Sequence, residues 1–102
     1  MIYLISRHPG ALEWLLQHID QPAVHLEHLD DAAMIAPGDT VVGTLPVNLV
    51  ADICRRGARY LHLQINIPRP LRGQELSARQ IYELGGVLVE YAAHRSGEGE
   101  HL

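Results

Sequence analysis

Two short runs of the sequence, residues 2–6 and 40–45, have apolar residues on both sides of the chain. Strands that are covered on both faces have this character, whereas a strand with one solvated face alternates apolar and polar residues. Each run is followed by a segment with apolar residues at helical spacing, residues 11–19 after the first and 46–56 after the second. This succession predicts an α/β fold in which helices cover both faces of a parallel sheet.

Two further segments, residues 23–28 and 59–65, alternate apolar and polar side chains and are predicted to be edge strands. A last helix is predicted after Ser77, which is a residue type favoured at the N-cap. Its apolar face would comprise Ile81, Leu84, Leu88 and Tyr91. The predicted order of elements is therefore β-α-β-β-α-β-α, with a mostly parallel four-stranded sheet of order 2-1-3-4. Right-handed crossovers would place the first helix on one face and the second on the other.

The length and charge of the chain restrict its class. At 102 residues it is long enough for one domain, which we expect to span residues 1–95, with residues 96–102 as a flexible tail. The formal net charge of −4 argues against a general DNA-binding protein and against a polybasic membrane-binding protein. No apolar run approaches the roughly 20 residues of a membrane-spanning helix. Since the start of the chain also lacks the basic region of a secretory signal, we expect a cytoplasmic protein.

The sequence offers little for a metal ion. The single cysteine, Cys54, excludes an intramolecular disulfide and a cysteine-rich zinc site. His25 and His28 have a spacing that can suit a metal on a helix, but on a strand it places them on opposite faces. We therefore expect neither a metal ion nor a cofactor.

The residues that follow the two buried strands form the candidate site. In a parallel sheet, ligands bind outside the carboxyl ends of the strands where the strand order reverses, here between the first and third strands. Two loops, residues 6–10 and 43–48, should meet at that point. Each loop leads into a helix N-terminus, where free N–H groups and the helix dipole attract an anion. The pattern is typical of a site for a phosphate ester.

Four polar side chains of these loops are candidates for catalysis, namely Ser6, Arg7, His8 and Thr44. Arg7 presents a forked set of donors that suits phosphate, and His8 carries a ring that titrates near neutral pH. The candidates for ligand contact are Pro9, Gly10, Trp14, Gly43, Leu45, Pro46 and Asn48, with Asn66 and Arg69 near the end of the fourth strand.

Ordinary structural roles are the alternative for each of these residues. The arginine and the histidine could be solvated loop residues, and the hydroxyls of Ser6 and Thr44 could cap helices. Gly43 could be a packing glycine. Trp14 lies within one helical turn of the loop, where it would either stack on a base or pack in the helix interface.

The segment that contains the arginine and the histidine also carries a family resemblance. Residues 3–14 (YLISRHPGALEW) resemble the start of the small CRISPR-associated proteins called Csx-sixteen, which are found beside type III systems. The similarity continues through PGD at 37–39, VGTLPV at 42–47, GARYLHL at 57–63 and RGQELS at 72–77. It covers nearly the whole chain through about Tyr91.

The resemblance implies a ring nuclease with a Rossmann-like fold that acts as a homodimer and needs no metal. Such enzymes degrade cyclic oligoadenylate, typically the four-membered ring, and thereby switch off the type III antiviral response. In a reaction of this kind a ribose 2′-hydroxyl attacks the neighbouring phosphorus and leaves a 2′,3′-cyclic phosphate and a 5′-hydroxyl. Arg7 would stabilise the phosphoryl charge, and His8 would exchange a proton with the attacking or leaving oxygen.

Two other functions stay open at this point. The chain could be a module that sequesters the cyclic nucleotide without cleaving it. It could also be a protein-interaction subunit that uses the polar side of residues 59–65, formed by Tyr60, His62 and Gln64, which would otherwise be solvated or line a dimer contact.

Overall fold

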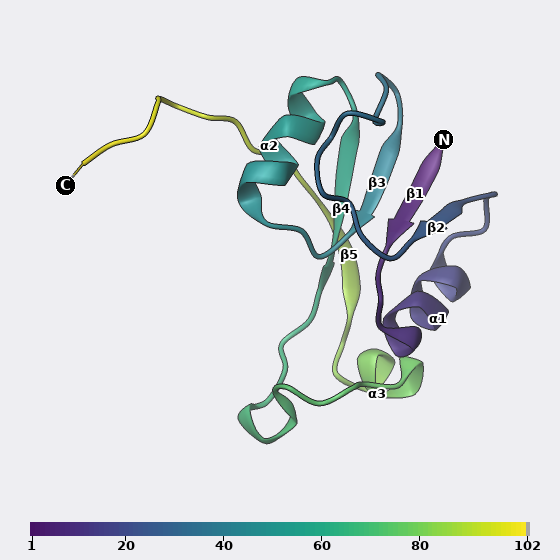
Figure 1. Cartoon of the computed structure of the whole chain (residues 1–102). Coiled ribbons are helices and arrows are strands. Elements are labelled where there is room, and N and C mark those ends of the chain that lie inside the picture. The colour runs from purple at the N-terminus through teal and green to yellow at the C-terminus, as the bar shows by residue number, and fades with distance from the viewer. Residues whose placement is uncertain (102) are drawn as a thin grey trace.

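The computed structural model describes residues 1–101, which form one sheet with helices on both faces (Figure 1). In chain order the elements are β1 (Ile2–Ile5), α1 (Pro9–His18), β2 (Val24–Leu26), β3 (Thr40–Gly43), α2 (Val47–Arg55), β4 (Arg59–Gln64), the 3-10 turn η1 (Arg69–Leu71), α3 (Ala78–Glu83) and β5 (Val87–Tyr91). The strand order is β2-β1-β3-β4-β5, in which the first four strands are parallel and β5 is antiparallel to β4. The Rossmann-like α/β class and the predicted order of the first four strands are confirmed.

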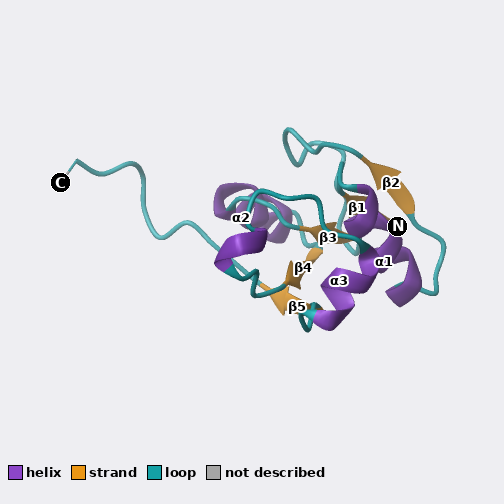
Figure 2. Cartoon of the chain, turned by 90° about the horizontal axis from the view of Figure 1, so that it is seen from below, coloured by secondary structure: helices purple, strands orange, loops and turns teal. Residues whose placement is uncertain are grey.

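Each face of the sheet carries its own hydrophobic cluster. Val41 and Val42 are neighbours on β3 and both are fully buried, but they belong to different clusters. Val41 packs in the same cluster as Ile53 of α2, whereas Val42 shares a cluster with Trp14 of α1 and Ile81 of α3. Figure 2 shows the result, with α2 on one side of the strands and α1 and α3 on the other. The predicted placement of the first two helices on opposite faces is therefore confirmed.

The prediction of four strands and a long last helix is wrong at the C-terminal end. The helix α3 has Ser77 as its N-cap, as predicted, and that residue forms a capping box with Gln80. It ends before Gly85, which adopts φ +77° and donates its N–H to Tyr82, while the N–H of Gly86 bonds to the Ile81 carbonyl. This pair of bonds is a Schellman motif, which terminates a helix.

A fifth strand follows the glycines. Its residues Val87–Tyr91 pair with β4, so Leu88 and Tyr91 lie on a strand and not on the predicted helix face. The two valines of this segment favour an extended backbone. Because β5 covers β4, the predicted position of residues 59–65 at an edge is also wrong, and the edges are β2 and β5.

The chain leaves the sheet after Tyr91 and continues without helix or strand through residue 101 (Figure 1). Ala93 still packs against the cluster beneath α2, and the Arg95 guanidinium pairs with the Asp52 carboxylate of that helix. Within residues 1–101, no helix has both the length and the apolar character to cross a membrane.

Candidate functional site

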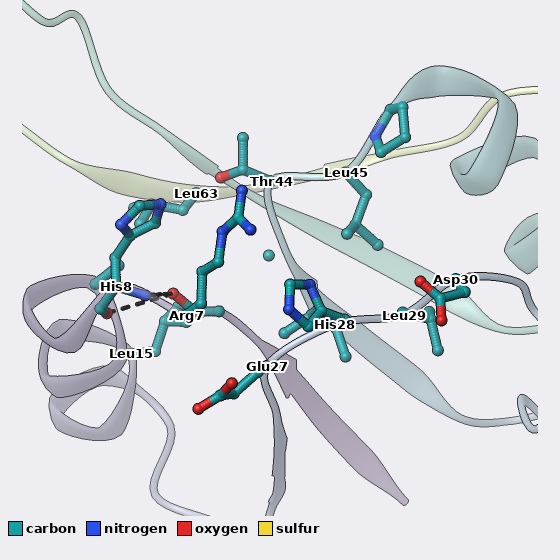
Figure 3. Close-up of a pocket in the computed structure, with 15 residues that line it drawn as sticks. Arg7, His8, Leu15, Glu27, His28, Leu29, Asp30, Thr44, Leu45 and Leu63 are labelled. Carbon is teal, nitrogen blue, oxygen red and sulfur yellow. Dashed lines mark hydrogen bonds between the residues drawn. The ribbon is translucent and has the colours of Figure 1, made fainter. Parts of the chain in front are cut away.

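The loops after β1 and β3 lie side by side because these two strands pair in parallel, with Leu4 opposite Val42. Together with the segment after β2 they surround an open cavity of about 480 Å³ (Figure 3). This volume falls in the range of small-molecule sites, and the position is the switch point of the sheet. Among the predicted site residues, the cavity is lined by Ser6, Arg7, His8, Gly43, Thr44, Leu45 and Pro46.

Arg7 is the central cation of this cavity. Figure 3 shows its guanidinium directed toward Thr44, with His8 on one side and His28 on the other. The side chain is exposed, and it takes part in none of the ion pairs formed within the described residues. Its five N–H donors are therefore available to an anionic ligand.

His8 is held by a carboxylate from a distant part of the chain. It is the N-cap residue of α1, and its Nδ1 lies 2.8 Å from Oε1 of Glu75. An ionised carboxylate can only accept, so Nδ1 donates the proton and the neutral ring keeps its free electron pair on Nε2. His8 therefore has a defined tautomer in which Nε2 can accept a proton.

The contact between Gly10 and Leu76 explains how Glu75 reaches this position. A Cβ atom on Gly10 would lie only 1.8 Å from the Leu76 carbonyl oxygen, so the loop before α3 rests directly on the first turn of α1. The space beside Gly10 is thus occupied by the protein backbone and not by a ligand. Glu75 precedes Leu76 and is placed next to the N-cap of α1 by the same contact.

Ser6 shapes the turn that presents Arg7 and His8. Its hydroxyl accepts the His8 N–H at 3.1 Å, and its own N–H donates to the Leu26 carbonyl at 3.0 Å. Nε2 of His25 lies 2.6 Å from the Ser6 carbonyl oxygen and donates to it. Ser6 therefore has the structural role of holding the loop in place, and His25 supports it from β2.

Thr44 is positioned by the buried Tyr60. The Tyr60 hydroxyl accepts the Leu45 N–H at 2.9 Å and lies 3.1 Å from the Gly43 carbonyl, so it holds the residues on both sides of Thr44. Burial raises the pKa of Tyr60, so the hydroxyl stays protonated at neutral pH. Tyr60 is thus neither solvated nor part of an exposed face, because only 2% of its surface is accessible.

Gly43 is required by the packing of the two central strands. A Cβ atom at this position would lie 2.8 Å from the Ile5 carbonyl oxygen of β1. The glycine lines the cavity, but the close approach that needs it is the one between β1 and β3.

The remaining predicted contacts lie outside the cavity lining. Trp14 is 1% exposed and stacks on His18 with 3.7 Å between ring centroids, so it is not available to stack on a base. Pro9 and Asn48 are exposed residues in the first turns of α1 and α2. Asn66 lines a separate hollow beyond β4, and Arg69 begins η1.

Sequence reasoning missed Glu75 and the segment after β2. The strand β2 ends at Leu26, so His28 lies in the following loop, and its ring faces the cavity in Figure 3. The rule that selected Arg7 and Thr44, a polar residue just after a parallel strand, would also have selected His28. The loop adds carboxylates at the rim as well, those of Glu27 and Asp30.

The carboxylates of Glu27 and Asp30 would repel an anion, so their positions restrict where an anion can bind in the cavity. Glu27 points away from Arg7, and Asp30 lies beyond Leu29 at the far side of the cavity (Figure 3). The positive charge of the lining is thus that of Arg7, whose guanidinium is directed toward Thr44. Among residues 1–101, no group of three or more histidine, cysteine, aspartate or glutamate side chains is arranged to hold a metal ion.

A comparison with known protein families identifies the family of this chain. Residues 3–94 match the family described as "Putative CRISPR-associated protein (Cas_VVA1548)". The chain belongs to this family. The expected relationship to CRISPR-associated proteins is therefore confirmed, and the matched range contains every residue of the cavity. Neither the curated proteins nor the solved structures contained a match.

Proposed function

We propose that this CRISPR-associated protein is a ring nuclease that binds cyclic tetra-adenylate and cleaves it without a metal ion. The observation that supports this function best is the convergence of Arg7, His8, His28 and Thr44 on one cavity at the switch point of the sheet. The resemblance of residues 3–14 to the Csx-sixteen proteins supplies the substrate class. Cleavage would end type III antiviral signalling by removing the cyclic messenger.

The phosphate would be bound by Arg7 and by backbone N–H groups. The cavity reaches Ala11 in the first turn of α1 and Pro46, the N-cap residue of α2, so two helix N-termini face it. Free amides and helix dipoles at these ends favour a negative charge, and the guanidinium adds paired donors. This local arrangement lets an acidic protein bind a polyanion.

The chemical step needs one base and one acid. A bond forms between the ribose 2′-oxygen and phosphorus, while the bond from phosphorus to the 5′-oxygen breaks. We assign His8 as the base because Glu75 leaves its Nε2 free to accept the 2′-hydroxyl proton. His28 lies across Arg7 from His8 and would donate a proton to the departing 5′-oxygen, which suits attack and departure in line (Figure 3).

Arg7, which lies between the two histidines, would stabilise the negative charge that develops on the phosphoryl oxygens. Thr44 would orient the same phosphate through its hydroxyl. The products are a linear oligoadenylate with a 2′,3′-cyclic phosphate and a free 5′-hydroxyl, and no atom other than the transferred protons comes from the protein.

A homodimer is part of this proposal. A four-membered ring has two-fold symmetry, and an isologous dimer would present one cavity to each half of it. Size-exclusion chromatography with light scattering, carried out with and without the cyclic nucleotide, tests this component separately.

The decisive experiment is incubation with cyclic tetra-adenylate in excess EDTA, with the products resolved by chromatography and mass spectrometry. We expect linear products that end in 2′,3′-cyclic phosphate. Recovery of the intact ring after tight binding would indicate a sequestering module instead. Cleavage that appears only after a divalent metal is added would overturn the metal-independent mechanism.

A further inference from the structure

The first part of the loop between β4 and α3, residues 65–74, extends beyond the sheet from the end at which the parallel strands terminate (Figure 1). It encloses a hollow of about 620 Å³, which we call the loop hollow. Its lining residues are Ile65, Asn66, Ile67, Pro68, Arg72 and Gly73. None of them lines the cavity at Arg7, so the loop hollow is a separate site that the proposed cleavage reaction does not use.

Hydrogen bonds within the loop give it a defined shape. The Leu71 N–H donates to the Pro68 carbonyl at 2.9 Å, and the Gln74 N–H donates to the Leu71 carbonyl at 3.2 Å. The Gln74 side-chain NH₂ group adds a bond to the Pro70 carbonyl at 3.1 Å. Pro68 and Pro70 also restrict the backbone, since the proline ring fixes φ. The loop hollow is therefore formed before a ligand binds, which lowers the entropic cost of binding.

Arg72 is the cation of the loop hollow, and one of its nitrogens is anchored. Its Nε–H donates to the Ile67 carbonyl at 3.1 Å, so the guanidinium is held across the loop. Arg72 forms none of the ion pairs found within residues 1–101, and the N–H donors of its two terminal nitrogens remain. These nitrogens present paired donors that match two oxygens of a phosphate group.

The surroundings of Arg72 contain little negative charge. No carboxylate lines the loop hollow, whereas two carboxylates line the cavity at Arg7. Residues 53–74 contain five arginines and neither aspartate nor glutamate, although the whole chain has a formal net charge of −4. The next carboxylate along the chain, that of Glu75, is hydrogen-bonded to His8. The positive charge of the loop hollow is therefore not neutralised by its own lining.

We propose that the loop hollow binds the phosphate group of an organic phosphate ester. Two phosphate oxygens would accept hydrogen bonds from the terminal nitrogens of Arg72, and the Asn66 NH₂ group would donate to a third oxygen. The volume falls in the range of small-molecule sites, which leaves space beside the phosphate. Ile65, Ile67 and Pro68 supply an apolar wall for the organic part of the ligand.

The phosphate has two possible sources. A hollow of about 360 Å³ beside α3 adjoins both sites. It has Ile65 and Ile67 in common with the loop hollow. It has His8 and Thr44 in common with the cavity at Arg7, so a long nucleotide could extend from one site to the other. A separate phosphate ester could equally bind in the loop hollow alone.

NMR titration of the full chain with inorganic phosphate tests the site. The Arg72 Nε–H signal and the Asn66 side-chain amide signals should shift together and saturate, and acetate at the same ionic strength should bind about tenfold more weakly. Read at the Asn66 amide, Arg72→Gln should lower phosphate affinity by about tenfold or more. Arg55→Gln removes the same charge and should have no effect, because Arg55 is exposed at the end of α2 and lines no part of the loop hollow.

Three results would overturn the site. They are unmoved signals of Arg72 and Asn66, an equal response to acetate, and a shift of the Arg55 side chain in parallel with that of Arg72. Asn66→Ala, read at the Arg72 Nε–H, should also weaken phosphate binding, and an unchanged backbone amide spectrum verifies that each variant is folded. None of these measurements depends on ring cleavage, so either proposal can fail while the other stands.

Binding of cyclic tetra-adenylate, measured by calorimetry, identifies the source of the phosphate. If the nucleotide reaches the loop hollow, Arg72→Gln should raise its Kd about tenfold, because a hydrogen-bonded charge is lost. If the ligand is a separate ester, the Kd of the nucleotide should be the same in Arg72→Gln and in wild type.

Discussion

The imidazole of His8 is hydrogen-bonded through Nδ1 to the carboxylate of Glu75 at 2.8 Å, across 67 positions of the chain. The pair joins the first helix to the loop before the last one, and it determines which ring nitrogen of His8 faces the cavity. A carboxylate that orients a histidine in this way is a common support for proton transfer. In the proposed mechanism Glu75 is therefore a positioning residue, since it would act on the substrate only through His8.

Removing the Glu75 carboxylate should reduce turnover without a matching loss of binding. We expect Glu75→Ala to lower kcat about tenfold with a small change in KM, because the Nδ1–H loses its acceptor and the ring loses its fixed orientation. Glu75→Gln keeps an acceptor oxygen and should recover part of the rate. The ¹⁵N shifts of the His8 ring report the tautomer directly, and equal shifts in wild type and Glu75→Ala would contradict the assigned role.

Loss of Arg7 should weaken binding of the cyclic nucleotide. Hydrogen bonds to a charged group contribute about 1.5–3 kcal/mol, so Arg7→Ala should raise the Kd about 10- to 100-fold, as measured by calorimetry. Arg79→Ala is a suitable control because Arg79 is exposed on α3 and pairs with Glu83 away from the cavity. Unchanged affinity in the Arg7 variant would show that the phosphate is bound elsewhere.

Replacement of His28 should affect the chemical step. A positioned acid or base contributes typically 10²–10⁴-fold, so we expect His28→Ala to lower single-turnover cleavage by about 10²-fold or more. Binding of the intact ring should change little. His94→Ala provides the comparison, since His94 is an exposed residue beyond β5. A His28 variant that cleaves at the wild-type rate would remove this residue from the mechanism.

The close contact at Gly10 predicts a stability change opposite to that expected from helix propensity. Alanine favours a helix more than glycine does, yet Gly10→Ala would bring a methyl group within 1.8 Å of the Leu76 carbonyl. We expect a loss of about 1–3 kcal/mol in the free energy of unfolding, measured by chemical denaturation. Gly97→Ala has open space around it and should leave stability unchanged.

The raised pKa of Tyr60 predicts that the folded chain loses stability at alkaline pH. Burial raises its pKa in the folded chain above the ordinary value of 10.0, so the unfolded chain ionises first as the pH increases. The stabilisation is present in full below pH 10 and falls as the pH rises toward the folded-state pKa. Chemical denaturation gives the free energy of unfolding at pH 8 and at pH 11, and its decrease between these two pH values should be smaller for Tyr60→Phe than for wild type. An equal decrease in the two proteins would mean that Tyr60 does not contribute to the loss of stability.

The sequence predicted the centre of the fold because the centre has the simplest pattern. The two strands that are covered on both faces were recognisable from their apolar residues, and the loops after them contain Arg7 and Thr44. Because the two strands are parallel, their carboxyl ends lie at the same end of the sheet, and this alone brings Arg7 and Thr44 together.

The errors arose where one pattern fits two structures. Leu84 and Leu88 are spaced as on a helix, while residues 87–91 can equally form a strand, and the Gly85–Gly86 pair decides between them. Glu75 could not be predicted, because its place beside His8 depends on a tertiary contact between distant segments. Trp14 was ambiguous from its position, and its burial was decided by the packing of α1 against the sheet.

The central location of β1 and β3 also bears on how the site responds to thermal fluctuation. Buried strands in the middle of a sheet exchange their amide hydrogens last, whereas edges and termini open at low free-energy cost. Arg7 and Thr44 are each attached within two residues of such a strand. Brief detachment of β5 or of the C-terminal segment would therefore leave both side chains and the β2 contacts of Ser6 in place, so the cavity around Arg7 and Thr44 would persist through such openings.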